Sequence, residues 1–288
     1  MDAKPKLAII GGSGLYSMEG LLDIQEQDID TPFGKPSAPI ITGKLEGGRV
    51  AFLARHGIGH HILPSEINFR ANIYALKYLG VENIVSISAC GSLREDYAPG
   101  ELVIPDQLFD FTRDRKRTFF GDGLVAHISI AEPFCSRFSR QVFEAVKDTG
   151  ATVHQGGALI TIEGPRFSTK AESNTFRSWE MSLIGMTTSP EAFLAREAEI
   201  CYAVMGHVTD YDVWHVTEEP VTVEMVIEVL YRNTHIAQQA VRNLVRNLKP
   251  DRDCDCPTAL ASALITNPAV IPAETRVKLG LLVDKYLK

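Results

Sequence analysis

The sequence has no long hydrophobic run and no excess of positive charge. No apolar stretch approaches the roughly 20 residues that a membrane-spanning helix needs, and the opening residues MDAKPKLAIIGG lack the apolar core of a signal peptide. The formal net charge is -7 at pH 7, which argues against a broad electrostatic grip on nucleic acid or on an anionic membrane. We therefore expect a cytoplasmic protein that binds neither nucleic acid nor membranes and that has at most a local cationic pocket.

The chain also lacks the composition of a disordered protein and any clear linker. Of its 288 residues, 45% are hydrophobic and 23% are charged, which is ordinary for a globular protein with a substantial core. No Gly/Ser-rich stretch interrupts the pattern before about Lys249, and no internal repeat is visible. We expect one domain over residues 1–248 and a C-terminal extension over 249–288, packed on the same domain or on a neighbouring subunit.

Cysteine is scarce, with five residues in the chain. Cys90, Cys135 and Cys201 lie in apolar surroundings, which is typical of reduced, packed thiols. Cys254 and Cys256 form a CxC in the polar segment DRDCDCP, where a strained disulfide, a metal and plain solvent exposure all remain open. Because a CxC alone supplies too few ligands for zinc, the sequence predicts no metal site.

Short β-like runs alternate with amphipathic helical patterns along the chain. The expected strands are Leu7–Ile10, Val50–Ala54, Ile84–Ser88, Leu102–Ile104, Ala158–Ile162 and Cys201–Val208. The expected helices are Ser65–Leu79, Ser136–Thr149, Lys170–Trp179, Pro190–Ala198, Val223–Leu248 and a last one at about Ala273–Tyr286. The alternation predicts an α/β domain.

Polar side chains gather where the predicted strands end: Ser13, Arg55, His56, Ser88, Glu163 and Asp210. In open α/β sheets ligands bind at that edge, so we expect one composite pocket.

Three segments at this edge suit an anion. The small-residue turns at Ser13 and at Ser88-Ala89 let backbone N–H groups and hydroxyls approach phosphate or sugar. Arg55 offers a planar fork of donors, and His56 and His60 follow it closely. Zinc binding by the histidines is disfavoured because no acidic or cysteine ligand lies at helical spacing nearby, and Cys90 shows no partner base that would make it a nucleophile.

Other residues suit a planar base. The ring of Phe167 is able to stack on a base, and a protonated carboxyl at Asp210 or Asp212 is able to give a proton to a ring nitrogen. An ionised carboxylate would instead accept a hydrogen bond from an exocyclic amine. A nicotinamide-dependent Rossmann dehydrogenase is the rival interpretation, although the third glycine of its fingerprint would fall on Ser17.

Several motifs in the same order resemble the methylthioadenosine phosphorylase branch of the trimeric purine nucleoside phosphorylase family. They are IIGGSGLY, DTPFGKPS, LARHG, ACGSLRE, PDQ, AEPFC, TIEGPRFS, GMTTSPE and TDYD, and the resemblance covers nearly everything from residue 7 to about residue 248. The resemblance implies a single α/β domain with a mixed central β-sheet flanked by helices. It also implies a homotrimer or a dimer of trimers.

The resemblance also assigns roles to residues. It implies that phosphate is held by Ser13, Arg55, His56, the Ala89 amide and Thr187. It implies that Met186 lies against the ribose, that Phe167 stacks on the purine beside the specificity residue Ser168, and that Asp210 and Asp212 face N7 and the 6-amino group. The residues that it implies for the 5' end are Val223, Val226, Ile227, His60 and, from the adjoining subunit, His127.

The activity implied is phosphorolysis of S-methyl-5'-thioadenosine, with Asp210 as proton donor and no cofactor besides phosphate as co-substrate. Gly185 departs from the family pattern, in which many members carry Asn before the Met-Thr pair. The alternatives are a purine nucleoside phosphorylase acting on 6-oxopurine nucleosides or methylthioinosine, and a nucleoside-binding module without turnover.

Overall fold

A long central strand, β5 (Asn83–Ser92), organises the sheet in the computed structural model, which describes residues 4–12, 18–216 and 222–287. It runs parallel to β1 (Leu7–Gly11) and β11 (Cys201–Asp210), and its last residues pair antiparallel with β10 (Leu183–Gly185). The mixed central sheet expected from the resemblance is therefore confirmed.

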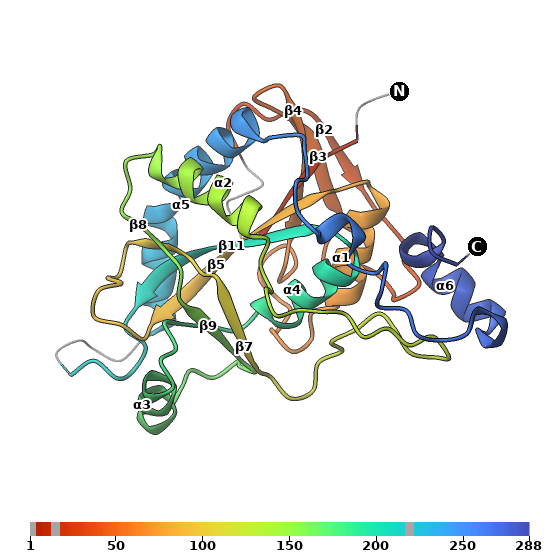
Figure 1. Cartoon of the computed structure of the whole chain (residues 1–288). Helices are drawn as coiled ribbons and strands as arrows, with labels where there is room; N and C mark the ends of the chain where they lie inside the picture. Colours follow the sequence, from red (N-terminus) through yellow and green to blue (C-terminus); the bar gives the residue numbers. More distant parts are fainter. Residues whose placement is uncertain (1–3, 13–17, 217–221, 288) are drawn as a thin grey trace.

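The remaining strands extend the sheet on both sides of β5 (Figure 1). The main path runs β2-β3-β4-β1-β5-β10-β9-β7, while β11 also pairs with β6, and β6 with β8. These strands are β2 (Leu22–Gln27), β3 (Ile40–Leu45), β4 (Gly48–Ala54), β6 (Leu102–Ile104), β7 (Gln107–Phe111), β8 (Val153–Gln155) and β9 (Ala158–Ile162). Because β1, β4, β5 and β11 are mutually parallel, their carboxyl ends meet at one edge.

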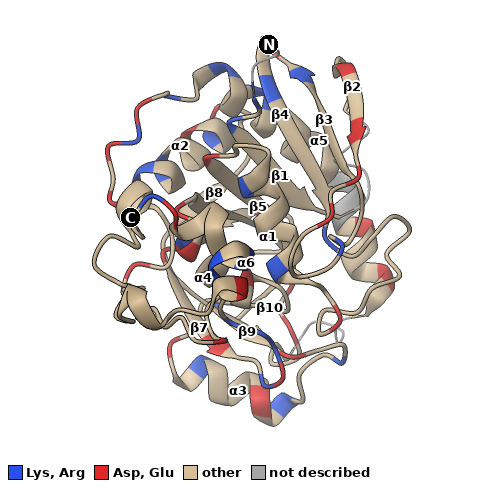
Figure 2. Ribbon diagram, turned by 90° about the vertical axis from the view of Figure 1, so that its right-hand side faces the viewer, with Lys and Arg blue, Asp and Glu red and all other residues tan. Residues whose placement is uncertain are grey.

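Helices cover both faces of the central strands, so these strands are buried and carry almost no charge (Figure 2). One core lies under α2 (Ser136–Lys147) and α5 (Val223–Asn247), and the other under α1 (Phe69–Tyr78) and α4 (Thr188–Glu197). Successive residues of β1 alternate between them, since Ile9 belongs to the first core and Ile10 to the second.

The remaining helical elements lie at the periphery. Helix α3 (Lys170–Ser178) places Phe176 against β9 and β10. The C-terminal segment contains two short 3-10 helices, η1 (Cys256–Thr258) and η2 (Pro268–Val270), and α6 (Ala273–Val283). Leu279 and Leu282 of α6 join the core under α1 and α4.

The division into residues 1–248 and 249–288 stays a prediction. No helix in the described ranges is both long and apolar enough to cross a membrane.

The predicted strands and helices are present, with differences at some ends. The helix expected from Ser65 begins instead at Phe69, because the Asn68 side chain accepts a hydrogen bond from the Ala71 amide at 3.2 Å and caps the helix there. Strands β2, β3, β7, β8 and β10 were not predicted. Strand β2 is mostly exposed, and β8 and β10 have three residues each, so pairing with neighbours defines them rather than a hydrophobic pattern.

Truncation of Phe138 tests the packing under α2, where this ring is fully buried. We expect Phe138→Ala to lower the free energy of unfolding by about 3–5 kcal/mol through lost burial and a residual cavity. The control is Val277→Ala on α6, where the side chain is 82% exposed and the expected change is within about 0.5 kcal/mol. Denaturant unfolding at fixed protein concentration measures both, and equal stability of the two variants would contradict this packing.

Candidate active site

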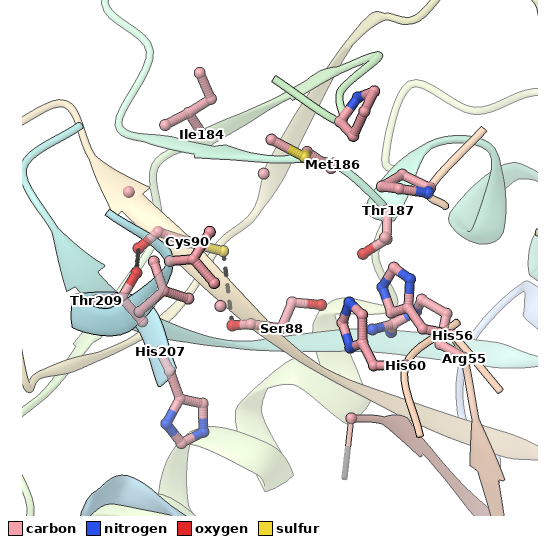
Figure 3. Close-up of a pocket in the computed structure, with 18 of the residues that line it drawn as sticks. Arg55, His56, His60, Ser88, Cys90, Ile184, Met186, Thr187, His207 and Thr209 are labelled. Atoms are coloured by element: carbon pink, nitrogen blue, oxygen red, sulfur yellow. Dashed lines mark hydrogen bonds between the residues drawn. The ribbon is translucent and has the colours of Figure 1, made fainter. Parts of the chain in front are cut away.

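A cavity of about 680 Å³ lies at the edge where the carboxyl ends of the parallel strands meet. Figure 3 shows a part of it, with Arg55, His56, His60 and Thr187 on one side and Thr209 on another. Of the residues singled out in the sequence, the structure brings these to its walls: Arg55, His56, His60, Ser88, Ala89, Phe167, Ser168, Met186, Thr187, Asp210, Asp212, Val223, Val226 and Ile227. The structure thus brings these residues to one cavity, and the roles assigned to them stay predictions.

Three residues singled out in the sequence do not line this cavity as described. Ser13 lies outside the described residues, so its role stays a prediction. His127 is exposed and absent from the walls, and its expected role across a subunit boundary also stays a prediction. Glu163 does not line the cavity, because its carboxylate accepts hydrogen bonds from the Arg113 amide and from Arg115 Nε, the latter at 3.0 Å.

The Arg55 guanidinium is almost entirely held by the protein. Its Nε and Nη2 donate to the two carboxylate oxygens of Glu191 at 2.9 and 3.0 Å. Nη2 also donates to Ser86 Oγ at 2.5 Å, and Nη1 donates to the Ile87 carbonyl at 3.3 Å. Tyr202 Oη donates to Glu191 Oε1 at 2.7 Å, and both members of the ion pair are buried. Arg55 therefore brings a fixed positive charge to the cavity wall, with little freedom to follow a ligand.

His56 is neutral and oriented by the backbone. Its Nδ1 lies 2.9 Å from the Ile62 carbonyl oxygen, so this nitrogen carries the proton and donates. Burial is the main cause that lowers the pKa of His56, to about 4. The ring stacks on His60, with centroids 4.3 Å apart. Nε2 is left to accept a hydrogen bond, for example from a P–OH group or a ribose hydroxyl.

Two hydroxyls complete this end of the cavity. Thr187 directly precedes α4 and its side chain caps no helix amide, while Figure 3 shows its hydroxyl on the same side as His56. The Ser88 hydroxyl lies 3.3 Å from that of Ser86, which in turn accepts from Arg55. Cys90 also lines the cavity, but burial raises the pKa of its thiol to about 12, which agrees with the sequence-based view that it is no nucleophile.

Asp210 ends β11 as a buried carboxyl group at the other end of the cavity. Its Oδ2 accepts from the Thr209 hydroxyl at 2.5 Å and its Oδ1 from the Asp212 amide at 2.7 Å. Desolvation outweighs these hydrogen bonds and raises the pKa of Asp210 above its usual value. The side chain is therefore suited to carry a proton and to donate it.

Asp212 lies beside Asp210 as a second buried carboxyl group, with the hydroxyls of Ser173 and Ser168 next to it. Burial is also the main cause that raises the pKa of Asp212, and the neighbouring Asp210 adds to it. The hydroxyls of Ser173 and Ser168 act in the opposite direction and favour the ionised form of Asp212, which is able to accept hydrogen bonds.

Sequence reasoning missed Arg115 and His207. Arg115 donates to the carbonyls of Met186 and Ser189 at 2.7 Å and thereby holds the segment that carries Thr187. It lies in the charged run TRDRKR, which resembles a solvated loop, so no local signal marks it.

His207 lines the cavity from β11, and burial lowers its pKa to about 4. The sequence indicated that His207 lies on a strand. It did not indicate that both ring nitrogens are buried without a hydrogen-bond partner among the described residues.

Comparison with known proteins identifies the family. The phosphorylase superfamily model matches residues 6–246. An S-methyl-5'-thioadenosine phosphorylase of Geobacter sulfurreducens is 51% identical over 98% of this chain and 99% of its own length, and one of Hyperthermus butylicus is 50% identical over 92% and 97%. A methylthioadenosine phosphorylase structure from an Antarctic soil metagenome matches with a TM-score of 0.93 and 45% identity, covering 98% of this chain and 100% of that one.

The chain belongs to the S-methyl-5'-thioadenosine phosphorylase family. A further structural relative is an adenosine/methylthioadenosine phosphorylase variant from Schistosoma mansoni in complex with methylthioadenosine, with a TM-score of 0.79 and 36% identity over 86% of this chain and 93% of that one.

Gly185 lines the cavity. It departs from the family pattern described above, in which many members carry Asn at this position. A Cβ atom built there would meet its nearest neighbour, Cys90 Sγ, at 3.7 Å, which is an ordinary contact. The backbone therefore does not require glycine, and its presence leaves free space beside Met186 rather than relieving strain.

Removal of the Glu191 charge tests the Arg55 arrangement. We expect Glu191→Gln to destabilise the protein by about 3–5 kcal/mol, because it leaves a buried guanidinium uncompensated. It should also raise the KM for phosphate as Arg55 shifts. The control is Asp122→Asn, which removes the exposed ion pair with Lys278 and should cost below about 1 kcal/mol. Thermal unfolding and phosphate titration measure both effects. A destabilised variant with unchanged phosphate KM would restrict Arg55 to a structural role.

Proposed function

We propose that this chain cleaves S-methyl-5'-thioadenosine with inorganic phosphate and releases adenine and 5-methylthioribose 1-phosphate. The observation that carries the proposal is the pair of buried carboxyl groups, Asp210 and Asp212, at one end of a cavity whose other end holds a fixed positive charge on Arg55. The names of the relatives and the Schistosoma mansoni complex with methylthioadenosine support the choice of nucleoside.

The base binds at the carboxyl end of β11 and stacks on Phe167. Asp210, whose protonated form is favoured by burial, donates its proton to N7 as the C1'–N9 bond breaks. The electron pair of that bond passes to the purine. The proton from Asp210 neutralises the resulting negative charge on the purine. Asp212 and the Ser168 hydroxyl, which both line the cavity, accept from the 6-amino group. A 6-oxo group is an acceptor itself and would face the carboxylate unfavourably, so we expect adenine nucleosides to be preferred over 6-oxopurine nucleosides.

Phosphate binds at the opposite end, against Arg55, Ser88, the Ala89 amide and Thr187, with Ser13 as a further expected contact. The unprotonated Nε2 of His56 accepts from the P–OH group. As positive charge develops on the ribose, a phosphate oxygen attacks C1' and replaces N9. Asp210 supplies the proton and phosphate supplies the nucleophile, so the proposed reaction needs no metal and no organic cofactor.

The sugar lies between these ends, with Met186 against the ribose. The first turns of α5 provide Val223, Val226 and Ile227, an apolar wall for the methylthio group, and His60 lies near the same end. Val223 and Ile227 are 56% and 46% exposed in the single chain, which suits a wall completed by a second subunit.

We further propose a homotrimer or a dimer of trimers in which the exposed His127 reaches the cavity of its neighbour. The reduced state of all five cysteines suits a cytoplasmic location.

Replacement of Asp210 tests the proton donor. We expect Asp210→Asn to lower kcat by about 100- to 10,000-fold, because the amide has no proton to give. In the native chain kcat should fall as the pH rises through the raised pKa of Asp210, since only the protonated form donates, and the variant should lack this dependence.

Asp212→Asn serves as the matched control. It should keep the pH dependence while its preference shifts from methylthioadenosine toward inosine. Steady-state rates of base release across the pH range provide both readouts, and near-native turnover by Asp210→Asn would remove Asp210 from the mechanism.

A further inference from the structure

Four of the five cysteines converge at one place, although they are far apart in the sequence. Cys135 immediately precedes α2, Cys201 begins β11, and Cys254 and Cys256 belong to the C-terminal segment. Their four Sγ atoms all lie within 4.8 Å of one another. None of the four lines the candidate active site, so this cluster needs an explanation of its own.

The sulfur positions suit a single tetrahedral ion. Zinc binds four thiolates at about 2.3 Å, which places neighbouring sulfurs roughly 3.8 Å apart. Cys201 Sγ and Cys254 Sγ are 3.5 Å apart, close to that separation and far from the roughly 2.05 Å of a disulfide bond. A CxC alone would supply two ligands, and the fold provides the other two from α2 and β11.

Positive charge surrounds the cluster. Arg196 Nη1 donates to Cys256 Sγ at 3.4 Å, and Arg137 Nη2 donates to Cys201 Sγ at 3.6 Å. The Arg252 guanidinium is a third positive charge beside Cys201.

These guanidinium groups match the charge of a metal-bound cluster. Four thiolates around a divalent ion leave two negative charges. Asp255 pairs with Arg196 at 2.7 Å and offsets one of the three positive charges, so two remain to balance the cluster. Four neutral thiols beside three guanidinium groups would have no such balance.

We propose that Cys135, Cys201, Cys254 and Cys256 bind one zinc ion as four thiolates. Each thiol loses its proton to solvent as its sulfur coordinates the ion, and no electron is transferred. All four positions are taken by the protein, so the site is structural and has no open position for a substrate. It would anchor the start of the C-terminal segment to the amino ends of α2 and β11.

The direct test is the metal content of the full chain, purified under reducing conditions without a chelator. Elemental analysis should find about one zinc per chain, and the Cys254→Ser/Cys256→Ser double variant less than about a tenth of that. The matched control is Cys90→Ser, which removes the remaining cysteine outside the cluster and should keep the full zinc content. A chelator should lower the Tm of the native chain and leave that of the double variant unchanged.

A second test does not depend on how the variants fold. Cobalt(II) alone, added to the reduced metal-free native chain, should give the thiolate-to-cobalt charge-transfer absorption of a tetrahedral four-sulfur centre, and zinc should abolish it. The proposal is overturned if the reduced chain takes up neither ion while all five thiols remain titratable. It is equally overturned if freshly purified protein contains disulfides among these cysteines and binds no zinc after their reduction.

Discussion

The buried ion pair between Arg55 and Glu191 links the fold to the chemistry. Arg55 follows β4, Glu191 lies on α4, and Tyr202 and Ser86 add hydrogen bonds from β11 and β5. A single group of side chains thus joins the parallel strands to the helix that follows the Met186-Thr187 segment. Because a buried charge without its partner is costly, the strands, α4 and the phosphate end of the cavity must assemble together.

Burial has opposite consequences at the two ends of the cavity. At the phosphate end it lowers the pKa of His56 and keeps the ring neutral, so the positive charge there comes from Arg55. At the other end it raises the pKa of Asp210. In the reaction that we propose, desolvation thus favours the acid that the leaving base needs and avoids a second mobile charge beside the phosphate. Arg115 fixes the segment between Met186 and Ser189, which carries Thr187, through the carbonyls of Met186 and Ser189.

Much of this arrangement was predictable from the sequence, for a physical reason. Short apolar strands that end in polar residues reveal the edge at which Arg55, Ser88 and Asp210 meet, because parallel strands share that edge. The sequence did not reveal partners contributed by distant segments. Glu191 lies in the first turn of a helix, and nothing local in the sequence indicates that it pairs with Arg55. Glu163 resembled a ligand contact, yet it pairs with Arg115.

The cysteines illustrate the same limit. The CxC was visible in the sequence, but the two sulfurs that complete a four-thiol cluster come from residues 135 and 201, which only the fold brings to it. Short strands such as β8 and β10 are likewise defined by their neighbours rather than by their own residues. Local pattern predicts which residues are polar or buried, whereas long-range pairing decides what each polar group is for.

The most direct measurement of the central claim is adenine release from S-methyl-5'-thioadenosine, with and without inorganic phosphate, and with inosine as a competing substrate. The account predicts release that depends strictly on phosphate, formation of 5-methylthioribose 1-phosphate, and preference for methylthioadenosine. Preference for inosine would keep the phosphorylase activity but contradict the role of Asp212. Absence of phosphate-dependent cleavage of either nucleoside would contradict the account as a whole.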